Sequence, residues 1–459
     1  MPALVLTLLL QSFLPIFDAP DSEYIGLSFV NTAADAADVT AAVTESDGSG
    51  VQSGQITLKA GAQKALLIQE ILDTESAPAA GWIQVDSTRS GMETFAASGN
   101  GDFLGSAPPV TSLSSSLILP NIQVDTGFKE LGATDTLVAL VFPGSFLPAT
   151  VTVALVGLDA VVAGSVTITM AARTSQVLRL SDVFRDFMPD NGVGGRTFQG
   201  YLTLTSTQEI AAWGRVETPL FRTTQVARAT SAVEEATTTL GPYFVFGGGY
   251  RSVLNLVNPT EQAVSLDIVG VDGNGGTLGE PATVTLSPGQ GLRSVVQELL
   301  GVVTVQTFPG PLFNGYIRIK EASGNSVRLV GNVDIYSIGQ GTFFASAMSY
   351  PLRGTARNWI VPFAMSGSDF YSGYAIANLN EFLAVQTDVT IEVFSNSGAL
   401  VETTQVSLSP RRQHVAVVPE GLASGYLRIT SNLLVGLVAV LGTRNGSILE
   451  QVPVTVAPN

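Results

Sequence analysis

The stretch that decides the fold covers residues 250–300 and reads YRSVLNLVNPTEQAVSLDIVGVDGNGGTLGEPATVTLSPGQGLRSVVQELL. Within it, short runs that alternate apolar and polar residues are separated by NP at 258–259, by DGNG at 272–275 and by PG at 288–289. Alternation with a period of two, rich in Val, Leu and Ile, is typical of a strand with one buried face. Asp-Gly and Asn-Gly pairs tolerate the positive φ that tight hairpin turns require. The stretch therefore predicts an antiparallel sheet joined by hairpins.

The same pattern occurs four times along the 459 residues. One strand of each copy opens with glycine and an aromatic residue, in the pairs Gly81-Trp82, Gly200-Tyr201, Gly315-Tyr316 and Gly425-Tyr426. Each copy holds about seven strand-like runs, a number typical of an antiparallel β-sandwich of about 100 residues. The chain is therefore predicted to be all-β, with four tandem antiparallel β-sandwich repeats over residues 1–106, 113–228, 237–350 and 357–459. Small polar links, clearest at 102–116 and 218–239, join these repeats.

Two residue types recur at fixed positions, and each has two interpretations. The aromatic residue of each pair belongs to the core or a corner in most sandwiches, but an exposed row would offer a stacking platform for sugars. An acidic residue follows the fourth strand of every copy, at Glu70, Asp182, Glu298 and Glu420. We interpret it as a carboxylate at the start of a short helical turn, where free N–H groups favour negative charge, and a cation ligand is the alternative. Burial of the aromatic residues would favour a structural role, and exposure would favour binding.

The charge of the chain excludes several classes of partner. Net charge is −16, with 22 Lys and Arg against 38 Asp and Glu, and no basic cluster occurs. Binding to nucleic acids and to anionic membrane surfaces is disfavoured, because both depend on positive charge. Charged residues make up only 13% of the chain, against about 25% in typical domains. Such a chain either buries much of its surface in interfaces or self-association, or covers its strands with neutral polar residues.

Residues that support catalysis or metal binding are few. The chain has no cysteine, which excludes disulfides, thiolate metal sites and a cysteine nucleophile. His414 is the only histidine, no G-x-S-x-G motif accompanies it, and we interpret it as a surface residue of a strand. The DGNGG sequence at 272–276 lacks the later ligands of a calcium-binding loop, so it is interpreted as a hairpin turn. The sequence thus predicts a protein that is not an enzyme and that has no cofactor and no metal site.

The N-terminus carries the run ALVLTLLL at residues 3–10, which is too short to span a membrane. The run has the apolar character of a signal-peptide core, but no Lys or Arg precedes it. The residues that follow include Leu14-Pro15-Ile16, which matches the strand that opens the later repeats, so we interpret the whole segment as a strand. This strand is the candidate for assembly between copies, by completing the sheet of a neighbour. Its candidate residues are Leu6, Leu8, Leu9, Leu10, Phe13, Leu14 and Ile16.

Four short motifs carry a resemblance to a known family. They are Asn258-Pro259, Val271-Asp272-Gly273-Asn274-Gly275, Leu286-Ser287-Pro288-Gly289 and Gly315-Tyr316-Ile317. Together they resemble uncharacterised tandem Ig-like β-sandwich repeats of secreted or cell-surface bacterial proteins, although the second repeat lacks both the Asn-Pro and the Pro-Gly. The resemblance implies Ig-like repeats, export from the cell and a non-catalytic role, and it identifies no active-site residue.

The leading functional expectation is a non-enzymatic extracellular structural protein of a bacterial cell surface. It would be a subunit of a surface filament or layer, or the stalk of an adhesin, and would associate with copies of itself through the apolar N-terminal strand. The alternative is a β-sandwich module that binds a surface carbohydrate or a protein partner. Neither expectation involves nucleic acid or a membrane span, and both allow the repeats to form either a rod or a compact chain.

Overall fold

The computed structural model shows a chain in which strands account for 66% of the residues and helices for 5%. The described residues are 10–17, 24–75, 79–99, 104–126, 133–192, 194–218, 221–232, 236, 238–302, 311–338, 344–352, 354–381, 385–444 and 448–457. The described sheets are antiparallel, so the prediction of an all-β antiparallel fold is confirmed.

The described strands fall into four consecutive groups of eight, which we call units 1 to 4. Unit 1 comprises β1 (Leu10–Ile16), β2 (Tyr24–Asn31), β3 (Ala37–Glu45), β4 (Val51–Leu58), β5 (Gln63–Leu67), α1 (Ile68–Leu72), β6 (Gly81–Ser87), β7 (Met92–Gly99) and β8 (Leu104–Ala107). Unit 2 comprises β9 (Ser114–Asp125), β10 (Asp135–Val141), β11 (Ala149–Gly157), β12 (Val162–Met170), β13 (Ser175–Arg179), α2 (Leu180–Val183), η1 (Arg185–Phe187), β14 (Thr197–Glu217), β15 (Arg222–Val226), β16 (Arg228–Ala229) and η2 (Thr230–Ala232).

The second half of the chain repeats this succession of strands. Unit 3 comprises β17 (Thr239–Phe246), β18 (Tyr250–Val257), β19 (Val264–Asp272), β20 (Thr277–Leu286), β21 (Gly291–Val295), α3 (Val296–Leu299), β22 (Phe313–Glu321), β23 (Val330–Ile338) and β24 (Phe344–Pro351). Unit 4 comprises β25 (Ala356–Ala364), β26 (Phe370–Asn378), β27 (Thr387–Ser395), β28 (Leu400–Leu408), β29 (Gln413–Val417), β30 (Gly425–Thr443), β31 (Leu449–Val452) and β32 (Thr455–Val456).

Units 1 and 3 each form two four-stranded sheets with the same strand order. In unit 1, sheet A has the order β1-β6-β3-β4 and sheet B the order β5-β2-β7-β8, and unit 3 follows suit with β17-β22-β19-β20 and β21-β18-β23-β24. In units 2 and 4 one long strand, β14 or β30, takes the place of the sixth and seventh strands and joins both sheets. The expectation of about seven strands per copy is therefore corrected to eight. The strands β8 and β15 lie in segments 102–116 and 218–239, which the sequence had suggested were links.

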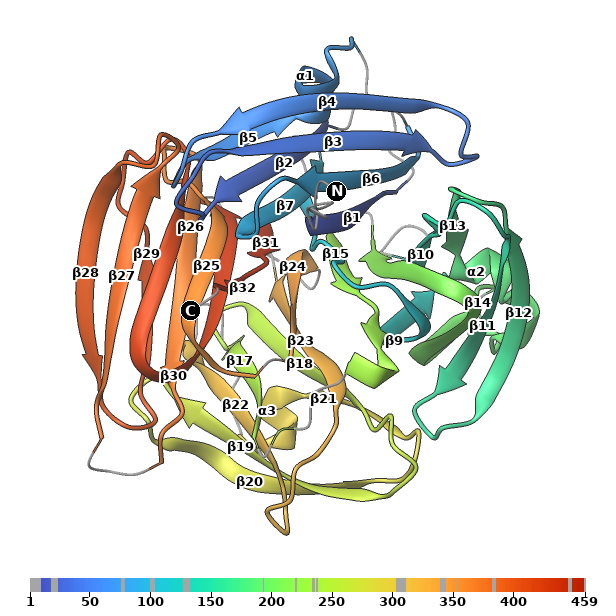
Figure 1. Ribbon diagram of the computed structural model, residues 1–459. Coiled ribbons are helices and arrows are strands. Elements are labelled where there is room, and N and C mark those ends of the chain that lie inside the picture. The colour runs from blue at the N-terminus through green and yellow to red at the C-terminus, as the bar shows by residue number, and fades with distance from the viewer. Residues whose placement is uncertain are drawn as a thin grey trace, which may run out of the picture.

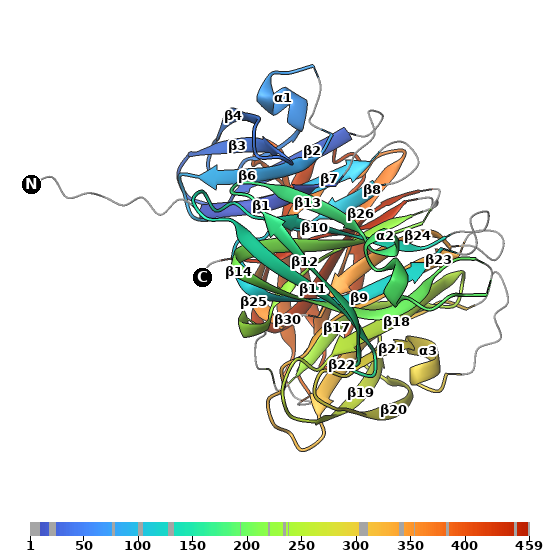
Figure 2. The same cartoon turned by 90° about the vertical axis from the view of Figure 1, so that its right-hand side faces the viewer.

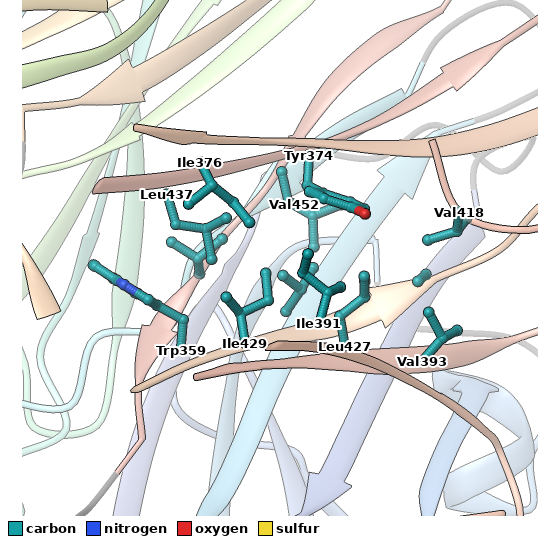
Figure 3. Packing of buried hydrophobic residues seen from close by; sticks show 14 of the residues in the cluster. Trp359, Tyr374, Ile376, Ile391, Val393, Val418, Leu427, Ile429, Leu437 and Val452 are labelled. Atoms are coloured by element: carbon teal, nitrogen blue, oxygen red, sulfur yellow. The ribbon is translucent and has the colours of Figure 1, made fainter. Parts of the chain in front are cut away.

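Apolar residues from both sheets of a unit meet in one core. In unit 1, Leu14 of β1, Leu27 of β2 and Ile83 of β6 are at most 1% exposed and belong to the same cluster. Figure 3 shows the corresponding core of unit 4, in which Ile376 and Ile391 face each other from different strands. Full burial of one such side chain contributes roughly 1.5–3 kcal/mol, so these clusters hold the two sheets of a unit together.

The four units form a closed ring around a common centre (Figure 1). The strands β8, β15, β24 and β31 line the centre, and each contacts the next, including β31 with β8. The strands β4, β12, β20 and β28 lie at the rim. From the side, the four units stay within one compact body (Figure 2). Of the two arrangements that the sequence allowed, the structure is therefore the compact one.

We call each contact between consecutive units a seam, so that seam 1/2 joins units 1 and 2 and seam 4/1 closes the ring. One backbone hydrogen bond recurs in every seam, from the first residue of a fifth strand to a carbonyl in the hairpin turn of the preceding unit. In ring order the donor and acceptor atoms are Ser175 N and Ser46 O, Gly291 N and Leu158 O, Gln413 N and Gly273 O, and Gln63 N and Asn396 O, at 2.9–3.2 Å. Because the fourth bond returns to unit 1, the same head-to-tail contact closes on itself.

A short helix follows the fifth strand in units 1 to 3 but not in unit 4. The helices α1, α2 and α3 contain the recurrent acids Glu70, Asp182 and Glu298. The equivalent residues 418–422 of unit 4 read VPEGL and form a turn instead. Proline and glycine are the two residues least favourable to helix, which explains the difference. The expectation of a helical turn at each acid is thus right for three copies and wrong for the fourth.

Candidate functional site

The Gly-aromatic pairs, the first candidate binding feature, lie buried at the seams. Their aromatic members Trp82, Tyr201, Tyr316 and Tyr426 are only 1–4% exposed. Burial raises the pKa of Tyr316 to about 12. The glycine of each pair is required because a Cβ there would come within 1.9–2.2 Å of a carbonyl oxygen on the neighbouring third strand. A sugar platform needs exposed ring faces, so these four residues do not provide one.

Each aromatic side chain reaches the turn between the fourth and fifth strands of the next unit. The hydrogen bonds run from Trp82 Nε1 to Arg173 O at 3.2 Å, from Tyr201 OH to Gly289 O at 2.5 Å and from Tyr316 OH to Arg411 O at 3.1 Å. In seam 4/1, Tyr426 stacks on Phe394 at 4.8 Å and its hydroxyl lies beside Gly61, the equivalent turn residue. All four turn residues have positive φ, between 62° and 70°. The recurrent aromatic residues and turns are therefore the two halves of one contact between units.

The recurrent acids do not converge on a site. Glu70 accepts a hydrogen bond from the N–H of Leu67 at 2.7 Å, which is the capping role expected of a carboxylate at a helix start. Glu298 and Glu420 are largely exposed and lie 3.8 Å from Arg251 and 3.1 Å from Arg444 respectively. Each acid belongs to a different unit, which keeps the four carboxylates apart. Across the residues that the structure describes, no three His, Asp or Glu side chains are grouped to hold a metal ion.

The remaining candidates from the sequence have structural surroundings. Asp272 Oδ1 accepts the N–H groups of Asn274 and Gly276, both at 2.8 Å, as in a hairpin turn. His414 lies on β29, a strand that pairs only with β26 in its sheet, and its ring centroid is 6.0 Å from that of Tyr374. Burial lowers the pKa of His414, which keeps the half-buried imidazole neutral. Both residues thus stabilise their own unit.

The candidate assembly strand is divided between described and undescribed residues. Three of its seven candidates, Leu6, Leu8 and Leu9, lie outside the described residues. From Leu10 onward β1 pairs along its whole length with β6 of its own unit. Phe13, Leu14 and Ile16 are at most 5% exposed, with Leu14 and Ile16 in the core of unit 1 and Phe13 in seam 1/2. The described part of the strand therefore completes its own sheet, and a contact with a neighbour falls to the residues before Leu10.

Two carboxyl groups that the sequence did not single out, the buried Glu450 and the half-buried Glu93, lie at seam 4/1. Ser106 of unit 1 donates to Glu450 of unit 4 at 2.5 Å, and Glu450 is 1% exposed. Glu93 of unit 1 and Thr455 of unit 4 both line the axial pocket. Burial raises the pKa of Glu450 to about 8 and that of Glu93 to about 7. A protonated carboxyl group carries no charge, so Glu450 joins units 1 and 4 through Ser106 without burying a charge.

Seam 2/3 contains a buried polar network centred on Asp334, which is 1% exposed. The side-chain amides of Asn121 in unit 2 and of Asn255 and Asn332 in unit 3 donate to its carboxylate at 2.6–2.8 Å. Arg293 lies 3.8 Å from the same carboxylate and donates to the side-chain oxygens of Asn121 and Asn255. Burial raises the pKa of Asp334, while Arg293 and the hydrogen-bond donors oppose that shift. The network ties β9 to β18 and β23 across the seam.

Two hollows lie between units. An axial pocket of about 240 Å³ is lined from all four units, by residues that include Glu93, Thr224, Asn332 and Gln451. A more open groove of about 350 Å³ lies in seam 4/1, between sheet B of unit 1 and residues of β25, β26 and β30 in unit 4. No local sequence signal could have revealed either hollow, because each forms between residues that are hundreds of positions apart.

No helix within the described ranges is both long and apolar enough to cross a membrane. A comparison with models of protein families finds no match, and a search of curated proteins finds no relative of this chain. The resemblance to tandem Ig-like repeats therefore stays a prediction. The geometry describes a ring in which the most conspicuous recurrent residues, the Gly-aromatic pairs and the turns, hold the units together.

Proposed function

We propose that this protein is a non-enzymatic extracellular structural protein of a bacterial cell surface and that it acts as a subunit of a surface filament or layer. The burial of the recurrent aromatic residues at the seams carries this proposal. Binding proteins present their contact residues on accessible surfaces, often on loops. Here the residues that recur in every copy stabilise the molecule itself, which supports a structural role.

The units correspond, in this proposal, to four tandem Ig-like β-sandwich repeats at 1–106, 113–228, 237–350 and 357–459. The support is that each unit has eight strands and a main hydrophobic core of its own, and that units 1 and 3 share one strand order. The closed ring supports a filament or layer subunit over an adhesin stalk, because a stalk requires its repeats to extend along a line.

Self-association is supported by apolar residues that the ring leaves exposed at the rim of unit 4. Leu400 and Val401 of β28 and Val415 and Val417 of β29 are 49–63% exposed. Both strands lie at the edge of their sheets, and edge strands with apolar side chains are templates for contacts with other chains. The low content of charged residues acts in the same direction, because few charges keep neighbouring molecules apart.

Negative-stain electron microscopy and light scattering of the purified full chain test the proposal. We expect filaments, sheets or concentration-dependent oligomers at micromolar protein. A chain that stays monomeric at every concentration would remove the proposal. A monomer that binds glycans on an array would instead favour the alternative, a carbohydrate-binding module.

A further inference from the structure

The groove in seam 4/1 is an apolar recess. Leu27 and Phe95 of unit 1 form one wall, and Phe363, Met365 and Leu441 of unit 4 form the other. Phe95 stacks on Phe363 with ring centroids 5.9 Å apart, so the two units are in direct contact beside the recess. A cavity of about 150 Å³ holds benzene. At about 350 Å³, the groove has room for two side chains of leucine or phenylalanine size.

The groove exists because unit 1 carries small residues where the other units carry large ones. On sheet B, Ala65 pairs with Ser28 and Ala97 pairs with Gly26. The residues at the same two register positions are Val177 and Arg215 in unit 2, Arg293 and Asp334 in unit 3, and Val415 and Val440 in unit 4. The recess is therefore specific to the seam that closes the ring.

At two other seams the larger side chains reach the preceding unit. The guanidinium of Arg215 lies 4.3 Å from the centroid of the Phe17 ring in seam 1/2. Arg293 donates to Asn121 in seam 2/3. The methyl groups of Ala65 and Ala97 are too short to do the same in seam 4/1. Large side chains thus fill this position in seams 1/2 and 2/3, whereas seam 4/1 leaves it open.

The groove and the start of β1 lie at opposite ends of unit 1. Tyr24 and Leu104 line the groove, and both are paired with Gly99 at the end of sheet B where β2 begins. The other end of β2 is marked by Asn31, which donates to Leu58 O. Leu10 lies at this second end, since its partner Ser87 also pairs with Val39 near the start of β3. The described chain therefore begins at the end of unit 1 opposite the groove.

We propose that the groove of one copy receives the apolar segment 1–9 of a second copy stacked on its face, an inference that rests on the proposed function. In an extended segment Leu4, Leu6 and Leu8 share one side, which supplies the side chains that the groove accommodates. The segment has no charged side chain, and Glu70 beside the groove already accepts the N–H of Leu67. Glu70 is the one charged side chain among the described residues that line the groove.

The length of segment 1–9 and the place where β1 begins favour insertion into the groove of a second copy over insertion into the groove of the same chain. Nine extended residues span about 30 Å, and running back along the seven residues of β1 would use about 20 Å of that reach. A neighbour stacked on the face where β1 begins needs no such return. The contact joins one face of a copy to the opposite face of the next, so it repeats without closing and builds a filament.

Disulfide trapping tests the contact, because the chain has no cysteine of its own. One preparation carries Leu6→Cys and another carries Ala97→Cys, and the two are mixed under mild oxidation. A disulfide needs Cα atoms within about 7 Å, so we expect a linked heterodimer. The matched control, Ser323→Cys in an exposed turn of unit 3, should give about tenfold less product. Equal product with both partners would overturn the proposal, as would an intrachain bond when Leu6→Cys and Ala97→Cys are combined in one chain.

A groove-filling variant separates this inference from the proposed function. Gly26→Leu with Ala65→Val introduces side chains that unit 2 carries at the same positions, and a Cβ at Gly26 meets nothing closer than 3.9 Å. We expect assembly, measured by light scattering, to weaken at least about tenfold with an unchanged melting temperature. If the filled variant assembles normally while deletion of residues 1–9 abolishes assembly, the groove is the wrong acceptor and the proposed function stands. If the parent chain itself never assembles, the proposed function fails and this inference fails with it.

Discussion

Seams 2/3 and 4/1 use the same backbone hydrogen bond, but their surroundings differ. Seam 2/3 is crossed by the chain between β16 and β17 and encloses the charged network around Asp334. Seam 4/1 joins the first and last units, so it has no connecting chain of its own. It contains the hydrogen bond from Ser106 to the buried carboxyl group of Glu450, the half-buried carboxyl group of Glu93 and the apolar groove.

The chain closes its ring at seam 4/1 although no connecting segment joins units 4 and 1. Units 4 and 1 are held close together by the three other seams, so their contact is intramolecular and needs little affinity of its own. Because seam 4/1 needs little affinity, it tolerates small residues such as Ala97. It also tolerates Glu93 and Glu450, whose ionisation would weaken the contact between the two units. We therefore expect seam 2/3 to contribute most to stability and seam 4/1 to respond most to conditions.

The largest expected loss of stability comes from a substitution at the centre of seam 2/3. Asp334→Ala leaves the partly buried Arg293 near three amide groups that have lost their common acceptor. Removing one partner of a buried charge pair costs about 3–5 kcal/mol in the free energy of unfolding. Urea denaturation followed by circular dichroism measures it. The matched change at seam 4/1, Glu450→Gln, keeps a neutral polar group and should cost less than about 1 kcal/mol. Equal losses in the two variants would contradict the difference between the seams.

A change in pH is expected to have an intermediate effect on stability, and that effect arises at seam 4/1. The pKa values of Glu93 and Glu450, about 7 and about 8, are raised above the value of about 4.3 for an unfolded glutamate. The stability that depends on their protonation is fully present below the unfolded pKa and is lost as pH rises through the folded pKa values. The melting temperature should therefore fall by roughly 3–6 °C between pH 5 and pH 9.

Hydrogen exchange locates that pH effect in the ring. Amide protection of β8 and β31 should decrease at pH 9 more than that of β15 and β24, because only the first two strands flank seam 4/1. The double variant Glu93→Gln/Glu450→Gln should flatten the dependence of the melting temperature above pH 6. If the double variant keeps the full slope, other groups cause it and the assignment to this seam is wrong.

The smallest expected effect compares two aromatic hydroxyls. Tyr201 donates to Gly289 O in seam 2/3, whereas within the described residues the structure shows no hydrogen bond from the Tyr426 hydroxyl in seam 4/1. Tyr201→Phe should cost about 0.5–1.5 kcal/mol, the net value of a hydrogen bond. Tyr426→Phe should stay within about 0.5 kcal/mol of the parent. Thermal denaturation of both variants measures the difference, and a loss in Tyr426→Phe as large as that in Tyr201→Phe would contradict the difference between the seams.

The strands and turns could be predicted from the sequence because their signals are local. The alternation of Val264, Leu266 and Ile268 indicated a half-buried strand, and Leu266 and Ile268 are fully buried. The side chain of Asn258 accepts the N–H of Thr260 in its own turn, and it also donates to Leu286 O and Ser287 O, which ties two strands together.

The centre of the ring could not be predicted in the same way. The strand β8 reads LGSA and resembles a polar link, because the three residues after Leu104 are small and do not alternate. Its burial comes from β15 and β31, and the hydrogen bond from Ser106 to Glu450 joins positions 344 residues apart. Periodicity indicates that one face of a strand is buried, but it does not show which element covers that face.

Small-angle X-ray scattering at pH 6 on a chain that lacks residues 1–9 tests the closed ring most directly. A compact chain of 459 residues has a radius of gyration of about 23 Å. Four separate units of about 13 Å radius of gyration strung in a line would instead give about 40 Å. We predict a value near 23 Å with a single-peaked distance distribution. A value near 40 Å would contradict the contact between units 4 and 1 and, with it, the account of the seams.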